Sequence, residues 1–122
     1  MNIIKRNRIV SQKILKEISI INDMTGQHTK EEFLNDEIIQ RAAAMTIINI
    51  GELTTVFSDD FRQTYSQIPW RKIKGLRNIM AHKYEIIDFE DVWETAITSI
   101  PELEKHLCEI LKKAVQDKNT EI

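Results

Sequence analysis

The feature that most restricts the fold of this 122-residue chain is its shortage of turn-forming residues, since it has 3 glycines and 2 prolines. Proteins carry on average about 12% of the two residues together, so this chain has about a third of the usual number. A β-sandwich or β-barrel needs a turn roughly every 8–12 residues, and this composition cannot supply so many. The sequence therefore excludes an all-β fold and favours helices joined by few connections.

Apolar spacing and capping signals predict where those helices lie. Apolar residues three and four apart in residues 14–21 mark a first helix that ends near residue 26. Thr29 and Glu32 form a capping box that opens a second helical region. A long helix follows over residues 36–57, with apolar positions 38, 42, 45, 53 and 56 on one stripe.

The second half of the chain has equally clear signals. A short polar helix is expected at residues 58–66, and Pro69 and Trp70 begin a helix that runs to His82. Residues 84–87 form a connection, and Asp88 caps a last helical region. Pro101 should break or kink that region, and a second capping box, Ser99 with Glu102, restarts it.

These elements predict an all-α, up-and-down bundle of four or five helices. The length suits one domain, which we assign to residues 1–115, followed by a polar tail over residues 116–122. A stripe in the last helix is expected to be bundle core first and subunit interface second: Leu103, Leu107, Ile110 and Ala114.

Several features predict a cytoplasmic protein with no membrane association. No run of about 18 apolar residues exists, and the first residues lack the apolar region and cleavage site of a signal peptide. The single cysteine, Cys108, cannot form an internal disulfide and fits a reducing compartment. We expect it to be a buried structural thiol.

The charge is unevenly distributed along the chain. The formal net charge is only −2, yet residues 61–84 carry six basic side chains and no acidic one. Such a local excess on an otherwise acidic protein indicates a site for an anion, of which phosphate is the obvious candidate. The alternative is a solvated basic face that complements acidic neighbours within the bundle. The residues expected to hold phosphate groups are Arg71, Lys72, Lys74 and Lys83.

Arg77 has an unusual position within this basic stretch. On a helical wheel Ile73, Leu76 and Met80 form the apolar stripe, and Arg77 falls at its edge. An arginine there must pair with a partner or face a crevice, because an unpaired buried charge is costly. Glu52 lies at a comparable edge of the long helix and is a possible partner.

A second stripe on the same helix contains Gly75, Asn78 and His82, and the glycine would allow another backbone to approach closely. Arg77 and His82 are five residues apart, which is roughly 140° around an ideal helix. They converge on one ligand only if the helix frays at His82, or if a second subunit completes the site in a two-fold dimer.

An arginine and a histidine in a positive crevice are the minimal set of groups for cutting RNA without a metal or cofactor. Histidine can move a proton to or from a hydroxyl near neutral pH, and arginine can hold phosphate and stabilise its growing charge. The 2′-hydroxyl would attack its own phosphate and leave a cyclic phosphate. The same pair is also common on ordinary helices, so the spacing alone is weak evidence for catalysis.

The chain resembles HepT-like proteins, a branch of the HEPN superfamily, through Arg77-Asn78-x-x-x-His82-x-Tyr84, which matches their R-x-x-x-x-H-x-Y pattern. Other segments in the expected order extend the likeness over roughly residues 8–112. These segments are Glu32-Phe33-Leu34, Ile50-Gly51-Glu52, Ile68-Pro69-Trp70-Arg71, Gly75-Leu76-Arg77-Asn78, Val92-Trp93 and Pro101-Glu102-Leu103.

The resemblance implies an all-helical HEPN homodimer with its active site between the protomers. It also implies the ribonuclease toxin of a type VII (HepT/MNT) toxin–antitoxin system, neutralised by a minimal nucleotidyltransferase (MNT) antitoxin. By position in the motif, Arg77 and His82 would be catalytic, Asn78 supporting, and Tyr84 the side chain that the antitoxin adenylylates.

Two other functions remain open from the sequence. The chain could be a non-catalytic helical module that binds the nucleotidyltransferase and nucleotide or RNA, or it could be the antitoxin or regulatory subunit of a toxic nucleotidyltransferase. For Tyr84, the alternative to modification is an aromatic side chain that packs at the rim of a dimer.

Overall fold

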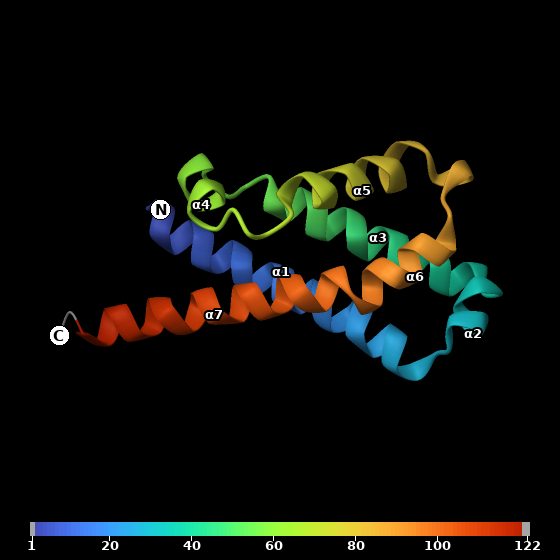
Figure 1. The fold of residues 1–122 in the computed structure, drawn as a ribbon, viewed down its shortest axis with the longest axis horizontal. Coiled ribbons are helices and arrows are strands. Elements are labelled where there is room, and N and C mark those ends of the chain that lie inside the picture. Colours follow the sequence, from blue (N-terminus) through green and yellow to red (C-terminus); the bar gives the residue numbers. More distant parts are fainter. Residues whose placement is uncertain (1, 121–122) are drawn as a thin grey trace.

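The computed structural model describes the backbone of residues 2–120 and the side chains of residues 2–113. Its elements, in chain order, are α1 (Ile3–Gln27), α2 (Lys30–Leu34), α3 (Glu37–Thr54), α4 (Asp59–Thr64), α5 (Trp70–His82), the 3-10 helix η1 (Tyr84–Ile86), α6 (Phe89–Ile97) and α7 (Ser99–Thr120). Helices α1, α3, α5 and the consecutive pair α6 and α7 run in alternating directions (Figure 1). The predicted all-α, up-and-down bundle is therefore confirmed.

Most helix starts follow the capping signals. At α2, Glu32 N–H donates to Thr29 Oγ1 over 3.1 Å, and Thr29 N–H donates to Glu32 Oε1 over 2.9 Å. The backbone N–H of Thr29, and after it the Thr29 side chain, hydrogen-bond the Glu32 carboxyl and lower its pKa from the ordinary value of 4.5. Asp36 and Asp88 likewise accept backbone N–H bonds at the starts of α3 and α6.

The predicted break near Pro101 is present, but the second capping box is not the signal that marks it. Thr98 has non-helical dihedral angles between α6 and α7, and Ser99 is already the first residue of α7. Ser99 Oγ accepts a hydrogen bond from Lys72 Nζ over 3.0 Å. The hydroxyl thus ties α7 to α5 instead of capping its own helix.

The core lies where α1, α3, α5 and the α6–α7 pair face one another. Its most fully buried side chains include Phe33, Phe57, Ile14, Ile18, Ile21, Ile50, Ile68, Met80, Leu103, Leu107 and Val92. Leu103 and Leu107 therefore form bundle core as expected, whereas the side chain of Ala114 lies outside the described residues.

Helix α3 buries a different face from the stripe noticed in the sequence. Ile38 and Met45 of that stripe are 81% and 59% exposed, while Ala43, Ile47 and Ile50 are buried. The helix is apolar on both sides, so its periodicity alone could not select the inner one. The result is an outward apolar face beside α5.

Three further expectations concern the termini, the cysteine and the membrane. Helix α7 continues to Thr120, so residues 116–120 of the expected tail have helical backbone, and the division at residue 115 stays a prediction. Cys108 is exposed, so the prediction of a buried thiol is wrong. Among the described residues, none of the helices has the length and apolar character needed to cross a membrane.

Candidate functional site

Arg77 lies where α5 crosses closest to α3, opposite Gly51. A Cβ atom placed on Gly51 would come within 2.5 Å of Arg77 Cγ and still nearer to Arg77 Cβ. Only glycine therefore permits this packing of α5 against α3. The sequence placed a close approach at Gly75, but a Cβ there would meet nothing within 4 Å in this protomer.

Gly51 was missed although a signal for it exists. A glycine inside a helix costs about 1 kcal/mol relative to alanine, so its presence in mid-α3 suggests a packing requirement. Gly51 also directly precedes Glu52, the residue proposed to meet Arg77.

The guanidinium of Arg77 is held by two neighbours. Its Nε donates to Glu52 Oε1 over 2.7 Å, and its Nη2 donates to the same oxygen. Its Nη1 donates to Asn78 Oδ1 over 2.6 Å. The side chain of Arg77 is only 25% exposed. These hydrogen bonds therefore fix the orientation of its guanidinium before any ligand binds.

His82 is the last residue of α5 and is exposed. The helix stays regular to that point, since Lys83 N–H still donates to Ile79 O over 2.8 Å. Arg77 turns toward α3 while His82 faces solvent, so the two side chains do not converge within one protomer.

The exposed side of α5 collects several of the predicted residues. Arg71, Gly75, Asn78 and His82 are spaced four, three and four apart and are all exposed, so they line one face of the helix. Lys74 is exposed beside them. Ile79, the residue after Asn78, is 44% exposed on the same helix, and Met45 is a separate exposed apolar side chain on α3.

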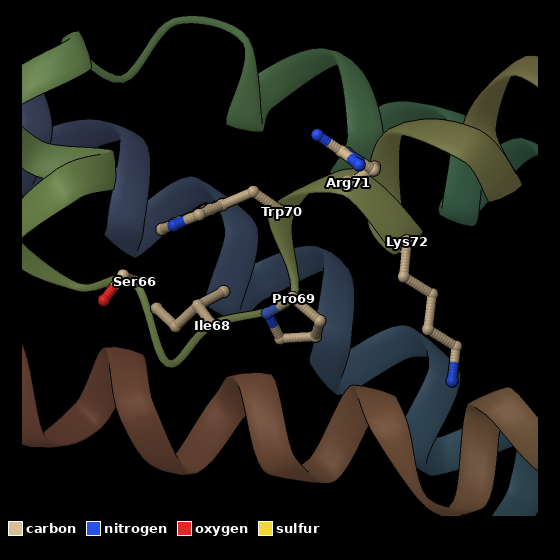
Figure 2. A pocket seen from close by; sticks show the side chains of 6 residues that line it. All are labelled: Ser66, Ile68, Pro69, Trp70, Arg71 and Lys72. Carbon is tan, nitrogen blue, oxygen red and sulfur yellow. The ribbon is translucent and has the colours of Figure 1, made fainter.

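The four lysines and arginines expected to bind phosphate do not form one cluster. Figure 2 shows Arg71 and Lys72 leaving the start of α5 in diverging directions, with Lys72 directed toward α7, where it bonds Ser99. Both line a groove of about 640 Å³ at the start of α5. Lys83 is exposed after the end of α5, at the other end of the helix.

Trp70 anchors the start of α5 and also lines that groove. Its indole N–H donates to the carbonyls of Arg62 and Tyr65 over 3.2 and 3.1 Å. Its ring packs edge-on against Phe57, with centroids 5.5 Å apart. Trp70 therefore fixes the start of α5 in the bundle while one edge of it borders the groove.

Tyr84 is partly buried, and its hydroxyl oxygen is enclosed. The ring lies edge-on to Phe89, with centroids 5.7 Å apart, and the Arg41 guanidinium lies 5.3 Å from the ring centroid. Tyr84 Oη is buried without a hydrogen-bond partner. Arg41 is bonded to Glu37 over 2.8 Å, and this hydrogen bond raises the pKa of Arg41. Neither sequence interpretation of Tyr84, as a modification site or as an aromatic at a dimer rim, anticipated the enclosure of its hydroxyl.

Comparison with known proteins shows which family this chain belongs to. The family model "Ribonuclease HepT-like" matches residues 14–110, which include Glu52 and the whole of α5 and η1. The chain belongs to the HepT-like family. No solved structure matches it.

Proteins from several organisms are similar to this HepT-like chain. "Putative RNase TTE0752" of Caldanaerobacter subterraneus is 33% identical over 109 residues, covering 89% of this chain and 97% of that protein. "Putative RNase MJ0127" of Methanocaldococcus jannaschii is 34% identical over 81% of this chain and 82% of that protein. "Probable ribonuclease HepT" of Thermococcus cleftensis is 30% identical over 75% of this chain and 84% of that protein.

In the described part of the HepT-like chain, no group of three or more His, Cys, Asp or Glu residues is placed to hold a metal ion. The groups at the site are the guanidinium, amide and imidazole of Arg77, Asn78 and His82, with the carboxylate of Glu52 behind them.

Proposed function

We propose that this HepT-like protein is the ribonuclease toxin of a toxin–antitoxin pair and cleaves RNA without a metal. The observation that carries the proposal is the arginine fixed in place by Glu52 and Asn78, one helical turn and a half from an exposed histidine on the same helix. Family membership and the names of its relatives support the same activity.

The chemistry assigns one task to each group. Neutral His82 takes the proton of a 2′-hydroxyl, whose oxygen attacks the adjacent phosphorus. Arg77 donates its N–H groups to the non-bridging oxygens as their negative charge grows. The bond to the 5′-oxygen breaks, an imidazolium returns a proton to that oxygen, and a 2′,3′-cyclic phosphate remains. Asn78 and Glu52 hold the guanidinium of Arg77 in a fixed orientation for contact with the phosphate.

The active form is a homodimer in which Arg77 of one copy works with His82 of the other. The pair does not converge within one protomer, because α5 is regular through His82. Helix α5 has an exposed apolar side chain, Ile79, and open space beside Gly75 for a second backbone, and α3 adds the exposed Met45. These features suit contact with a second copy.

Basic residues beyond the catalytic pair hold the flanking RNA. Arg71 and Lys74 share the exposed face of α5 with Asn78, and Lys83 follows His82. Lys72 contributes from the groove at the start of α5. Each would contact phosphate oxygens and fix the position of the strand without reading its sequence.

The central experiment measures cleavage by the purified chain and by single variants. Arg77→Ala and His82→Ala should each lower the rate at least about 100-fold, which is the usual contribution of such groups. His106→Ala, which removes another histidine from α7, should cleave normally. If wild type does not cleave RNA, the enzyme proposal is wrong and a binding module is favoured. If both variants cleave RNA as fast as wild type, the assignment of Arg77 and His82 as the catalytic pair is wrong.

The partner proposed here is a nucleotidyltransferase that transfers AMP to Tyr84 and so silences the toxin. Negative phosphates attached two residues from His82 would occupy the RNA phosphate site and repel the substrate. Co-expression should add mass in AMP steps to the peptide containing Tyr84. A Tyr84→Phe variant that is silenced normally, without a mass shift, would contradict this mechanism.

A further inference from the structure

The hydroxyl that would accept AMP is not accessible in this structure. Tyr84 Oη is buried and unpartnered, and the ring is packed between Phe89 and the guanidinium of Arg41. Transfer requires the oxygen to approach phosphorus to about 3–3.5 Å in line with the leaving group. A nucleotide held by another protein cannot reach an oxygen in this position.

The segment that carries Tyr84 is built so that it can move alone. Its backbone hydrogen bonds are local, from Ile86 N–H to Lys83 O over 3.0 Å and from Ile87 N–H to Tyr84 O over 3.2 Å. Lys83, Glu85 and Ile86 are exposed, so only Tyr84 and Ile87 of this segment are partly buried. The buried hydroxyl without a partner favours release, because water would satisfy it.

Arg41 is the group that closes over the ring. Its guanidinium lies 5.3 Å from the centroid of Tyr84 and is fixed by its bond to Glu37, one turn earlier on α3. A cation over an aromatic face stabilises the enclosed ring. Arg41 thus connects α3, which belongs to the bundle, to a segment whose other tertiary contacts are the packing of Tyr84 and Ile87 against the core.

We infer that Tyr84 is a concealed acceptor, which becomes available only when residues 83–87 swing outward, and that Arg41 is the positioning residue that keeps this segment closed. The inference rests on the adenylylation proposed above and adds a conformational step to it. The nucleotidyltransferase must bind the open segment, so a brief collision with the closed toxin does not adenylylate Tyr84.

The chemical step and its consequence then follow. In the open segment Tyr84 Oη attacks the α-phosphorus of ATP supplied by the partner; the bond to pyrophosphate breaks, and the phenolic proton passes to solvent. The attached AMP cannot enter a space that leaves Oη no solvent access. The modified segment therefore stays open beside His82, which makes silencing persistent.

The test uses O-acetylation of the free protein by N-acetylimidazole, mapped by mass spectrometry. Tyr65, the other of the chain's two tyrosines, reports the general activity of the reagent. Tyr84 should react at least about ten-fold more slowly in the folded chain than in the urea-unfolded chain. Arg41→Ala should react several-fold faster than wild type, and Arg6→Ala, an exposed arginine near the start of α1, should match wild type.

The same variants are then adenylylated by the partner with ATP and Mg²⁺, and Arg41→Ala should again be faster. Acetylation of Tyr84 at the unfolded rate in folded wild type would overturn the concealment, even if adenylylation occurs. Equal acetylation rates in wild type and Arg41→Ala would overturn the role of Arg41. Slow acetylation of Tyr84 in wild type and faster acetylation in Arg41→Ala, without any AMP transfer by the partner, would support the closed segment held by Arg41 and refute the adenylylation.

Discussion

Replacing Gly51 with alanine should destabilise the bundle although it improves helix propensity. The new Cβ would lie within 2.5 Å of Arg77 Cγ, and Arg77 Cβ, which is nearer still, cannot turn away because it is attached to the backbone. Overpacking of this kind costs about 1–3 kcal/mol, and a contact this close belongs at the upper end of that range. The gain in propensity returns about 1 kcal/mol, which leaves a net loss of about 2 kcal/mol.

Urea unfolding followed by circular dichroism measures this loss at fixed protein concentration. A loss of 2 kcal/mol lowers the melting temperature of a domain this size by roughly 6–10 °C. Gly26→Ala is the matched control, because a Cβ on Gly26 in α1 also meets nothing within 4 Å and lies outside the proposed dimer face, so it should stabilise α1 by up to about 1 kcal/mol. A Gly51→Ala protein as stable as wild type would refute the argument that α5 packs directly on this glycine.

Three further predictions concern charge and metal. Glu52→Gln keeps the shape of the partner of Arg77 but removes its negative charge, so RNA, which is an anion, should bind more tightly. The kcat should fall on the order of ten-fold, because the guanidinium of Arg77 is held less firmly in its orientation; an unchanged kcat would contradict the positioning role of Glu52. EDTA should leave cleavage intact, and a loss of activity restored by Mg²⁺ would disprove the metal-free mechanism. Because the pKa of Glu32 is lowered, its cap stabilises α2 fully above pH 4.5 and is lost as the pH falls through the lowered pKa; Glu32→Gln should remove this dependence from acid unfolding curves.

Local signals in the sequence determine most helix boundaries, and these could be predicted. Thr29 with Glu32 and Asp88 satisfy backbone N–H groups within three residues of themselves, so no distant contact is needed to recognise them. Ser99 fits the same pattern, yet its hydroxyl bonds Lys72, which is 27 residues away. A long-range partner overrode the local signal there.

Which face of a helix is buried was harder to predict where both faces are apolar. In α3 the outward stripe with Ile38 and Met45 looks as hydrophobic as the inner one with Ile47 and Ile50. The difference arises from the neighbouring helices, whose packing a single sequence does not specify. An exposed stripe of this kind is what the proposed contact with a second copy would cover.

The site shows the same division between local and long-range information. The edge position of Arg77 on its helical wheel led to Glu52 as a partner, and the structure places the two in contact. By contrast, Gly51 and Gly75 both lie inside helices, and only the packing of α3 on α5 tells which one faces a neighbour. The enclosure of Tyr84 Oη likewise depends on Phe89 and Arg41, which come from other elements.

The central claim is a catalytic site shared between two copies, and mixing two inactive variants tests it most directly. Arg77→Ala and His82→Ala chains are unfolded together, refolded as a mixture and assayed on RNA. Half of the randomly formed dimers then contain one of each chain, and one of their two sites has both residues intact. The account predicts recovery of about a quarter of wild-type activity, with almost none from either variant alone. A mixture as inactive as its components would contradict the shared site.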